Sequence, residues 1–141
     1  MKKLVLAVVV SIIFYTLADI LIWQRIFEAN ELWLGIGIYH KGWQMMLYGL
    51  MASGAILLLP RWRQSVVFSV SLYTLAHSGL SDVLYYWLDG RAIPELLPWL
   101  DEAPLILFSP VTNSNLILGS LAWIGIWIII LNYNKLNIGG H

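Results

Sequence analysis

Residues 65–88, SVVFSVSLYTLAHSGLSDVLYYWL, form an apolar stretch that is long enough to cross a lipid bilayer as one helix. His77 lies near its middle and Asp82 about two turns before its end, where hydrocarbon disfavours both side chains. At helical spacing the polar side chains fall on one side of the helix: Thr74, His77, Ser78, Ser81, Asp82 and Tyr85. The stretch therefore predicts a membrane helix whose polar face needs partners from other helices.

The composition extends this prediction to the whole chain of 141 residues. Hydrophobic residues make up 60% and charged residues 11%, against roughly 25% charged in soluble domains. We therefore expect an all-α, polytopic membrane protein with one domain. The chain has no cysteine, which excludes disulfides, thiolate nucleophiles and iron–sulfur clusters. Eight basic and eight acidic side chains balance, which argues against a nucleic-acid partner and leaves membrane lipids as the expected surroundings.

Apolar runs predict a bundle of four transmembrane helices, at about residues 4–23, 43–59, 65–88 and 114–133. The first run continues past Ala18 to Trp23, so we interpret it as a helix and not as a cleaved secretory signal. A single helix from Leu32 to Pro60 would be ~44 Å long, more than the ~30 Å hydrocarbon core. We therefore expect residues 32–38 to lie at the interface, with a bend permitted by Gly35, Gly37 and Gly42.

Residues 89–113 are the one long connection and hold four of the five prolines. Pro94 suits the first turn of a short helix. The residues that would give this helix an apolar face are Ile93, Leu96, Leu97 and Leu100. We expect a structured connection that lies on the outer surface as a lid, followed by capping of the last helix at Thr112 and Asn113.

Basic residues predict the orientation. Five of them flank the predicted helices on one side, namely Lys2, Lys3, Arg61, Arg63 and Lys135, and three lie on the other, namely Arg25, Lys41 and Arg91. Because basic residues gather in cytoplasmic segments, we expect a multi-pass integral membrane protein with both termini in the cytoplasm. All eight acidic residues then fall in the outward half or the outward segments.

Three polar faces meet at one depth if the first three helices are neighbours. The first helix contributes Tyr15 and Asp19, and the second contributes His40, Gln44 and Tyr48 at four-residue spacing. With the third helix they predict a polar cavity open to the outer face. Its ligand-binding or acid–base candidates are Asp82, His77, Asp19, His40, Gln44, Tyr15, Tyr48 and Tyr85. The alternative is a hydrogen-bonded network that only specifies helix packing.

Three functions fit this pattern. The first is binding of an amphipathic, lipid-soluble molecule of the quinone or isoprenoid kind. The second is a metal-assisted or acid–base intramembrane enzyme that acts on a lipid, with Asp19, His40, His77 and Asp82 as candidate metal ligands, although no metal-binding motif such as HExxH is present. The third is a noncatalytic subunit of a larger membrane complex or a homo-oligomer. The sequence names no cofactor and leaves open whether the protein is an enzyme.

Overall fold

The computed structural model describes residues 2–24, 36–101 and 103–138, and their regular elements are all helices. These elements are α1 (Lys2–Ala18), a π-helical turn (Asp19–Gln24), α3 (Ile36–Leu58), α4 (Trp62–His77), α5 (Leu80–Leu88) and α6 (Asn113–Ile138). Three helical stretches are long and apolar enough to cross a membrane: Lys2–Ile22, Lys41–His77 and Asn113–Asn132. The predicted all-α class is confirmed.

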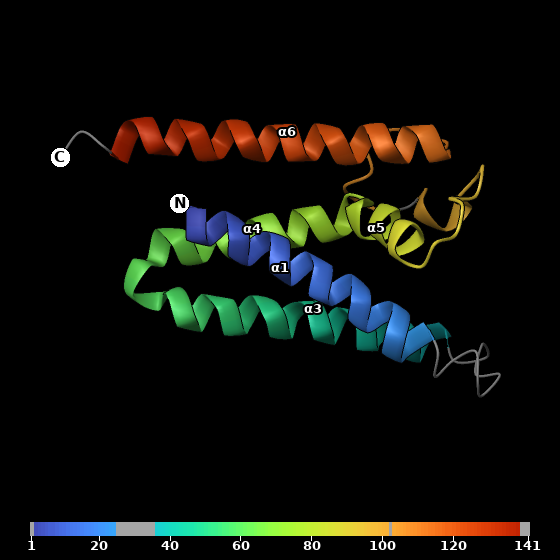
Figure 1. The fold of residues 1–141 in the computed structure, drawn as a ribbon, viewed down its shortest axis with the longest axis horizontal. Coiled ribbons are helices and arrows are strands. Elements are labelled where there is room, and N and C mark those ends of the chain that lie inside the picture. Colours follow the sequence, from blue (N-terminus) through green and yellow to red (C-terminus); the bar gives the residue numbers. More distant parts are fainter. Residues whose placement is uncertain (1, 25–35, 102, 139–141) are drawn as a thin grey trace.

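The stretch Lys41–His77 is folded back on itself as a hairpin of α3 and α4. Pro60 lies in the 3₁₀ turn Leu59–Arg61, and α3 and α4 run antiparallel from it (Figure 1). The ring of Phe68 covers Gly54, where a Cβ atom would lie 2.1 Å from the ring. The Ser65 hydroxyl donates a hydrogen bond to the Ala55 carbonyl at 3.1 Å. The two helices are therefore in close contact.

The second helix begins earlier than the sequence predicts. α3 is already helical at Ile36 and continues through Gly37 and Gly42, so the expected bend at these glycines is wrong. Glycine is common inside membrane helices, where the helical hydrogen bonds offset its flexibility. Gly35 and the rest of residues 25–35 lie outside the described residues.

The predicted helix over residues 65–88 is interrupted. α4 ends at His77 and α5 begins at Leu80, because Gly79 adopts a left-handed backbone with φ of +88°. A Cβ atom there would lie 2.2 Å from Leu116 Cδ1 of α6. The break therefore lets α6 pack directly against the backbone of the third helix.

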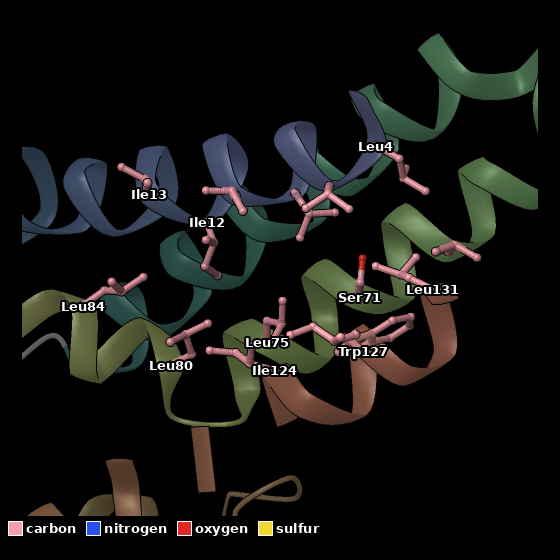
Figure 2. A pocket seen from close by; sticks show the side chains of 15 residues that line it. Leu4, Ile12, Ile13, Ser71, Leu75, Leu80, Leu84, Ile124, Trp127 and Leu131 are labelled. Carbon is pink, nitrogen blue, oxygen red and sulfur yellow. The ribbon is translucent and has the colours of Figure 1, made fainter. Parts of the chain in front are cut away.

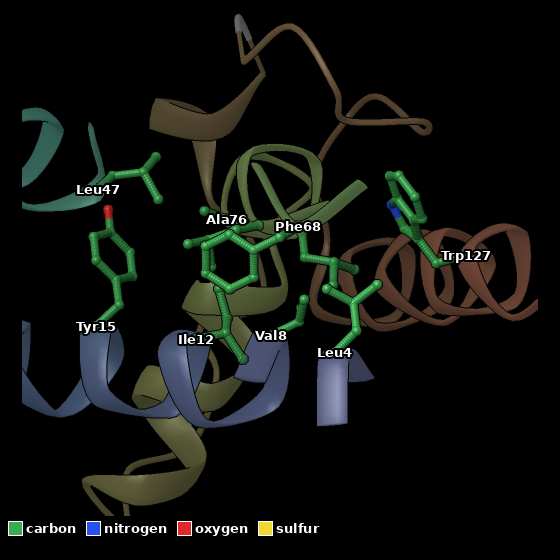
Figure 3. Close-up of a cluster of buried hydrophobic side chains, with 10 residues drawn as sticks. Leu4, Val8, Ile12, Tyr15, Leu47, Phe68, Ala76 and Trp127 are labelled. Atoms are coloured by element: carbon green, nitrogen blue, oxygen red, sulfur yellow. The ribbon is translucent and has the colours of Figure 1, made fainter. Parts of the chain in front are cut away.

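Two hydrophobic clusters hold the bundle together. The larger one joins α1, α3, α4 and α6 (Figure 3) and contains Leu4, Val8, Ile12, Tyr15, Leu47, Phe68, Leu72, Leu75, Ala76 and Trp127. The smaller one lies under the connection and is built on Leu97, Val111 and Leu116. The connection is thus part of the folded structure, as expected.

The connection differs in detail from the prediction. No helix begins at Pro94; instead a 3₁₀ turn forms at Pro98–Leu100, and Leu96 pairs with Thr112 in an isolated antiparallel bridge. Alternation along this extended segment buries Leu97 completely and leaves Leu96 exposed. The Thr112 hydroxyl accepts a hydrogen bond from the Asn115 N–H at 3.2 Å, which confirms Thr112 as the cap of α6.

The ends of the bundle differ in content. The N-terminus, the α3–α4 turn and the C-terminal end of α6 lie at one end, and the connection lies at the other (Figure 1). Four of the basic residues, Lys2, Lys3, Arg61 and Arg63, therefore belong to the same end.

Candidate functional site

His77 is the last residue of α4 and is enclosed by aromatic rings from two helices. Its ring centroid lies 5.2 Å from that of Trp43 on α3, edge to face, and 4.3 Å from that of Tyr73. Nδ1 lies 3.0 Å from the Tyr73 carbonyl oxygen. Because a carbonyl oxygen only accepts, Nδ1 carries the proton of this bond, and Nε2 is the ring atom left for other chemistry.

The same aromatic group extends to α1. Tyr15 is fully buried, and its ring lies 5.3 Å from that of Trp43 in an edge-to-face arrangement. Tyr15, Trp43 and His77 therefore form a row across α1, α3 and α4. The sequence placed Tyr15 and His77 at this depth but missed the contacts of Trp43 and Tyr73. The only sequence signal for Tyr73 is its position one helical turn before His77.

Two carboxyl groups lie beyond this row. Asp19 is buried in the π-helical turn after α1, and Asp82 is the third residue of α5, which packs against α1. The two side chains are close enough to interact electrostatically. The packing of α5 against α1 therefore places the carboxyl groups of Asp19 and Asp82 near each other.

The helix break sets the surroundings of His77 and Asp82. The Ser81 hydroxyl donates to the Ala76 carbonyl at 2.8 Å, and the Ser78 hydroxyl donates to the Leu75 carbonyl at 2.9 Å. These bonds satisfy carbonyl groups that the end of α4 leaves open. His77 thus lies at the C-terminus of α4, and Asp82 lies in the first turn of α5.

Tyr85 occupies the outer end of this arrangement. Its hydroxyl accepts a hydrogen bond from Arg91 at 2.9 Å, and the guanidinium lies 5.4 Å from the ring centroid. Arg91 also forms an ion pair with Asp89. The hydrogen bond to Arg91 therefore ties Tyr85 to the start of the connection. Tyr85 also interacts electrostatically with Asp19.

α3 turns a different face toward the other helices from the one that the sequence predicts. Trp43 and Leu47 point into the bundle, whereas Gln44 and Tyr48 are exposed, so the structure does not bring these two to the site. α3 is apolar on most sides, and its sequence pattern therefore does not select a face. The side chain of His40 lies outside the described residues.

The structure brings Tyr15, Trp43, Tyr73 and His77 together as a row of rings, and it places Asp19 near Asp82. We call these six residues the polar site. Within the described part of the chain, no group of three or more His, Cys, Asp or Glu side chains is placed to hold a metal ion. The metal hypothesis includes His40 and stays a prediction.

An apolar pocket of about 300 Å³ lies between α1 and α6 (Figure 2). Residues of α4 and α5 form its floor. The lining residues include Val5, Val9 and Ile13 of α1, Leu75 of α4, Leu80 and Leu84 of α5, and Ile124 and Ile128 of α6. Ser71 is the one polar residue in the lining, and its hydroxyl donates to the Phe68 carbonyl at 3.0 Å.

Of the seven candidate residues whose side chains the structure describes, none lines this pocket. No sequence pattern marks this pocket, because its walls are aliphatic residues of the kind found throughout apolar helices. Leu80 and Leu84 of its floor are each two residues from Asp82 on α5, which at helical spacing places Asp82 on the opposite face of that helix. The apolar pocket and Asp82 therefore lie at a similar level along the bundle, on different faces of α5.

Comparison with known proteins adds no relationship: no family model, curated protein or solved structure matches this chain.

Proposed function

We propose that this chain is a four-span integral membrane protein that binds an amphipathic, lipid-soluble molecule of the quinone or isoprenoid class. The hydrocarbon chain of that molecule lies in the apolar pocket, and its polar head lies at the polar site. In this arrangement α1, α3, the α4–α5 pair and α6 are the four spans. An even number of spans agrees with both termini lying at one end of the bundle, which we assign to the cytoplasmic side.

The observation that carries the proposal is the size and chemistry of the apolar pocket. Its volume of about 300 Å³ is at the lower limit for ligand pockets, and it is about twice a cavity of ~150 Å³ that holds one benzene molecule. Its lining residues Val9 and Ile128 are exposed, so the pocket opens to the surface of the bundle, from which a lipid-soluble molecule can enter. A flexible hydrocarbon chain is the occupant that fits a pocket without an available polar group.

The polar site supports an amphipathic occupant over a purely apolar one. Ionisable groups inside a membrane protein are costly and normally face a partner or a pathway. His77 Nε2 and the carboxyl of Asp82, three and two residues from the pocket-lining Leu80 along the chain, supply a donor or acceptor at a similar level of the bundle. A quinone oxygen or a headgroup oxygen of an isoprenoid is chemically suited to such groups.

Thermal unfolding in detergent with added polyprenol or quinone tests the proposal. A ligand that binds only the folded state stabilises it by about 2.7 kcal/mol at a concentration of 100 Kd. Val9 lines the pocket and is 43% exposed, and Val10 lies outside it and is 55% exposed. We expect Val9→Trp to fill the pocket and abolish the ligand-induced rise in Tm, and the matched control Val10→Trp to retain it.

Two results would contradict the proposal. One is an unchanged Tm of the wild-type protein with every polyprenol and quinone added. The other is an equal rise in Tm for the two tryptophan variants, since the ligand would then bind elsewhere.

A further inference from the structure

The connection contains an apolar tip, residues 103–108 with the sequence APLILF. Asp101, Ser109 and Val111 form a polar neck that closes the loop carrying the apolar tip. One carboxylate oxygen of Asp101 accepts hydrogen bonds from the Val111 N–H at 2.8 Å and from the Ser109 hydroxyl at 3.3 Å. Since α6 begins at Asn113, this neck lies beside the first turn of α6.

The apolar tip turns back along α6 instead of projecting away from the bundle. The Leu105 carbonyl accepts a hydrogen bond from the Trp123 indole N–H at 2.9 Å, and Trp123 is ten residues, or ~15 Å, into α6. A Cβ atom on Gly119 would lie 3.8 Å from Phe108 and 4.0 Å from Leu107. A stretch of the connection accordingly lies between α5 and α6 in Figure 1.

The apolar tip has one buried side and one exposed side. Ile106 packs into the smaller hydrophobic cluster and approaches the Gly79 break, where a Cβ atom would lie 3.3 Å from its Cδ1. Leu107 is 45% exposed and Phe108 is 44% exposed. On α6 at a similar depth, Leu118 and Leu121 are exposed by 56% and 57%. Leu107 and Phe108 are therefore exposed at the same level of the bundle as the outward-facing leucines of α6.

We propose that the apolar tip is a re-entrant segment inserted into the membrane leaflet on the side of the connection. The acyl chains of that leaflet are the partner that Leu107 and Phe108 contact. Nonhelical backbone at such depth is tolerated only where protein covers it or supplies its hydrogen bonds. The Trp123 indole N–H donates a hydrogen bond to the Leu105 carbonyl, and the Ile106 N–H donates one to the Ala103 carbonyl at 3.2 Å. The inference rests on the proposed spanning of the membrane by α6.

Labelling of single introduced cysteines with a charged maleimide, in membranes opened to both sides, tests the insertion. The chain has no cysteine of its own. The variants are Leu107→Cys in the apolar tip, Glu95→Cys in the exposed part of the connection, and Leu121→Cys on α6. Because apolar surroundings suppress the reactive thiolate, we expect Leu107→Cys and Leu121→Cys to react about tenfold or more slowly than Glu95→Cys.

Each alternative outcome has a distinct meaning. Fast labelling of Leu107→Cys with a protected Leu121→Cys would overturn the insertion and leave the spanning of α6 intact. Fast labelling of both would overturn the spanning itself, and with it the proposed function. Protection of Glu95→Cys as well would also contradict the proposal, because the apolar tip would then not be distinguished from the exposed part of the connection.

A second variant tests the role of the indole bond. Trp123→Phe, combined with Leu107→Cys, removes the donor to Leu105 and is expected to increase labelling severalfold. Trp127→Phe is the matched control, because its indole N–H bonds Thr74 of α4 and not the connection. Equal labelling of the two double variants would show that Trp123 does not hold the apolar tip in place.

Discussion

At Gly79 a single residue determines how the third and fourth helices meet. Its φ of +88° is a conformation that costs an L-residue ~1–2 kcal/mol, and its missing Cβ leaves room for Leu116. Gly79→Ala adds this backbone cost to an overpacking cost of ~1–3 kcal/mol. We expect a lower Tm and a lower free energy of unfolding in detergent.

Gly90→Ala is the control for this substitution. Gly90 also has a positive φ, +71°, but no atom lies within 4 Å of the position of its Cβ. The loss of stability is therefore expected to be limited to the backbone part, ~1–2 kcal/mol. Equal losses for the two variants would show that contact with Leu116 does not matter.

Asp82 is the residue whose charge separates a binding role from a packing role. Asp82→Asn keeps the shape and hydrogen-bonding capacity of the side chain and removes its negative charge beside Asp19. We expect the variant to fold with equal or slightly higher stability, and to show a smaller ligand-induced rise in Tm than the wild type. A full rise in Tm with polyprenol or quinone would remove Asp82 from the polar site.

At the scale of elements, a side-chain hydrogen bond couples α6 to α4. The Trp127 indole N–H donates to the Thr74 hydroxyl at 2.6 Å. A double-mutant cycle with Trp127→Phe and Thr74→Val is expected to give a coupling energy of ~0.6–1.7 kcal/mol, the range for polar pairs between membrane helices. Additive losses of unfolding free energy would contradict a direct interaction between the two side chains.

The helices were predictable from the sequence, and their interruptions were not. Pro60 marks the α3–α4 turn correctly, because proline cannot continue the helix. Gly79 lies inside an apolar run, and glycine is common in membrane helices, so its presence alone does not predict a break. The contact with Leu116 accounts for the break at this position. The position of the apolar tip depends on the bond between Leu105 and Trp123, residues that are 18 positions apart. No local pattern contains such a contact.

The candidate site was predictable where polar residues stand out against an apolar background. Tyr15, Asp19, His77 and Asp82 were selected for this reason; in the structure Tyr15 and His77 both contact Trp43, and Asp19 lies near Asp82. Gln44 and Tyr48 were selected by four-residue spacing alone, and the rotation of α3 leaves them exposed. The apolar pocket was not predictable, because it depends on how far apart α1 and α6 are placed.

For the whole molecule, the proposed orientation predicts which segments face the cytoplasm. Cysteines introduced at Lys3 and Arg63 are expected to react with a membrane-impermeant reagent only from the cytoplasmic side, because basic residues are retained there. A cysteine at Glu95 is expected to react only from the opposite side. Labelling of Lys3→Cys and Arg63→Cys from opposite sides would contradict the assignment of α1 and α3, which lie between them in the chain, as two spans.

The central claim is that the folded protein holds a lipid-soluble molecule in its apolar pocket. Native mass spectrometry of the protein released from mild detergent measures this directly, because a specifically bound molecule stays on the chain while bulk lipid dissociates. The account predicts a wild-type protein that carries one isoprenoid- or quinone-sized adduct, and a Val9→Trp variant that is folded and bare. A bare wild-type protein, or a Val9→Trp variant that keeps the adduct, would contradict it.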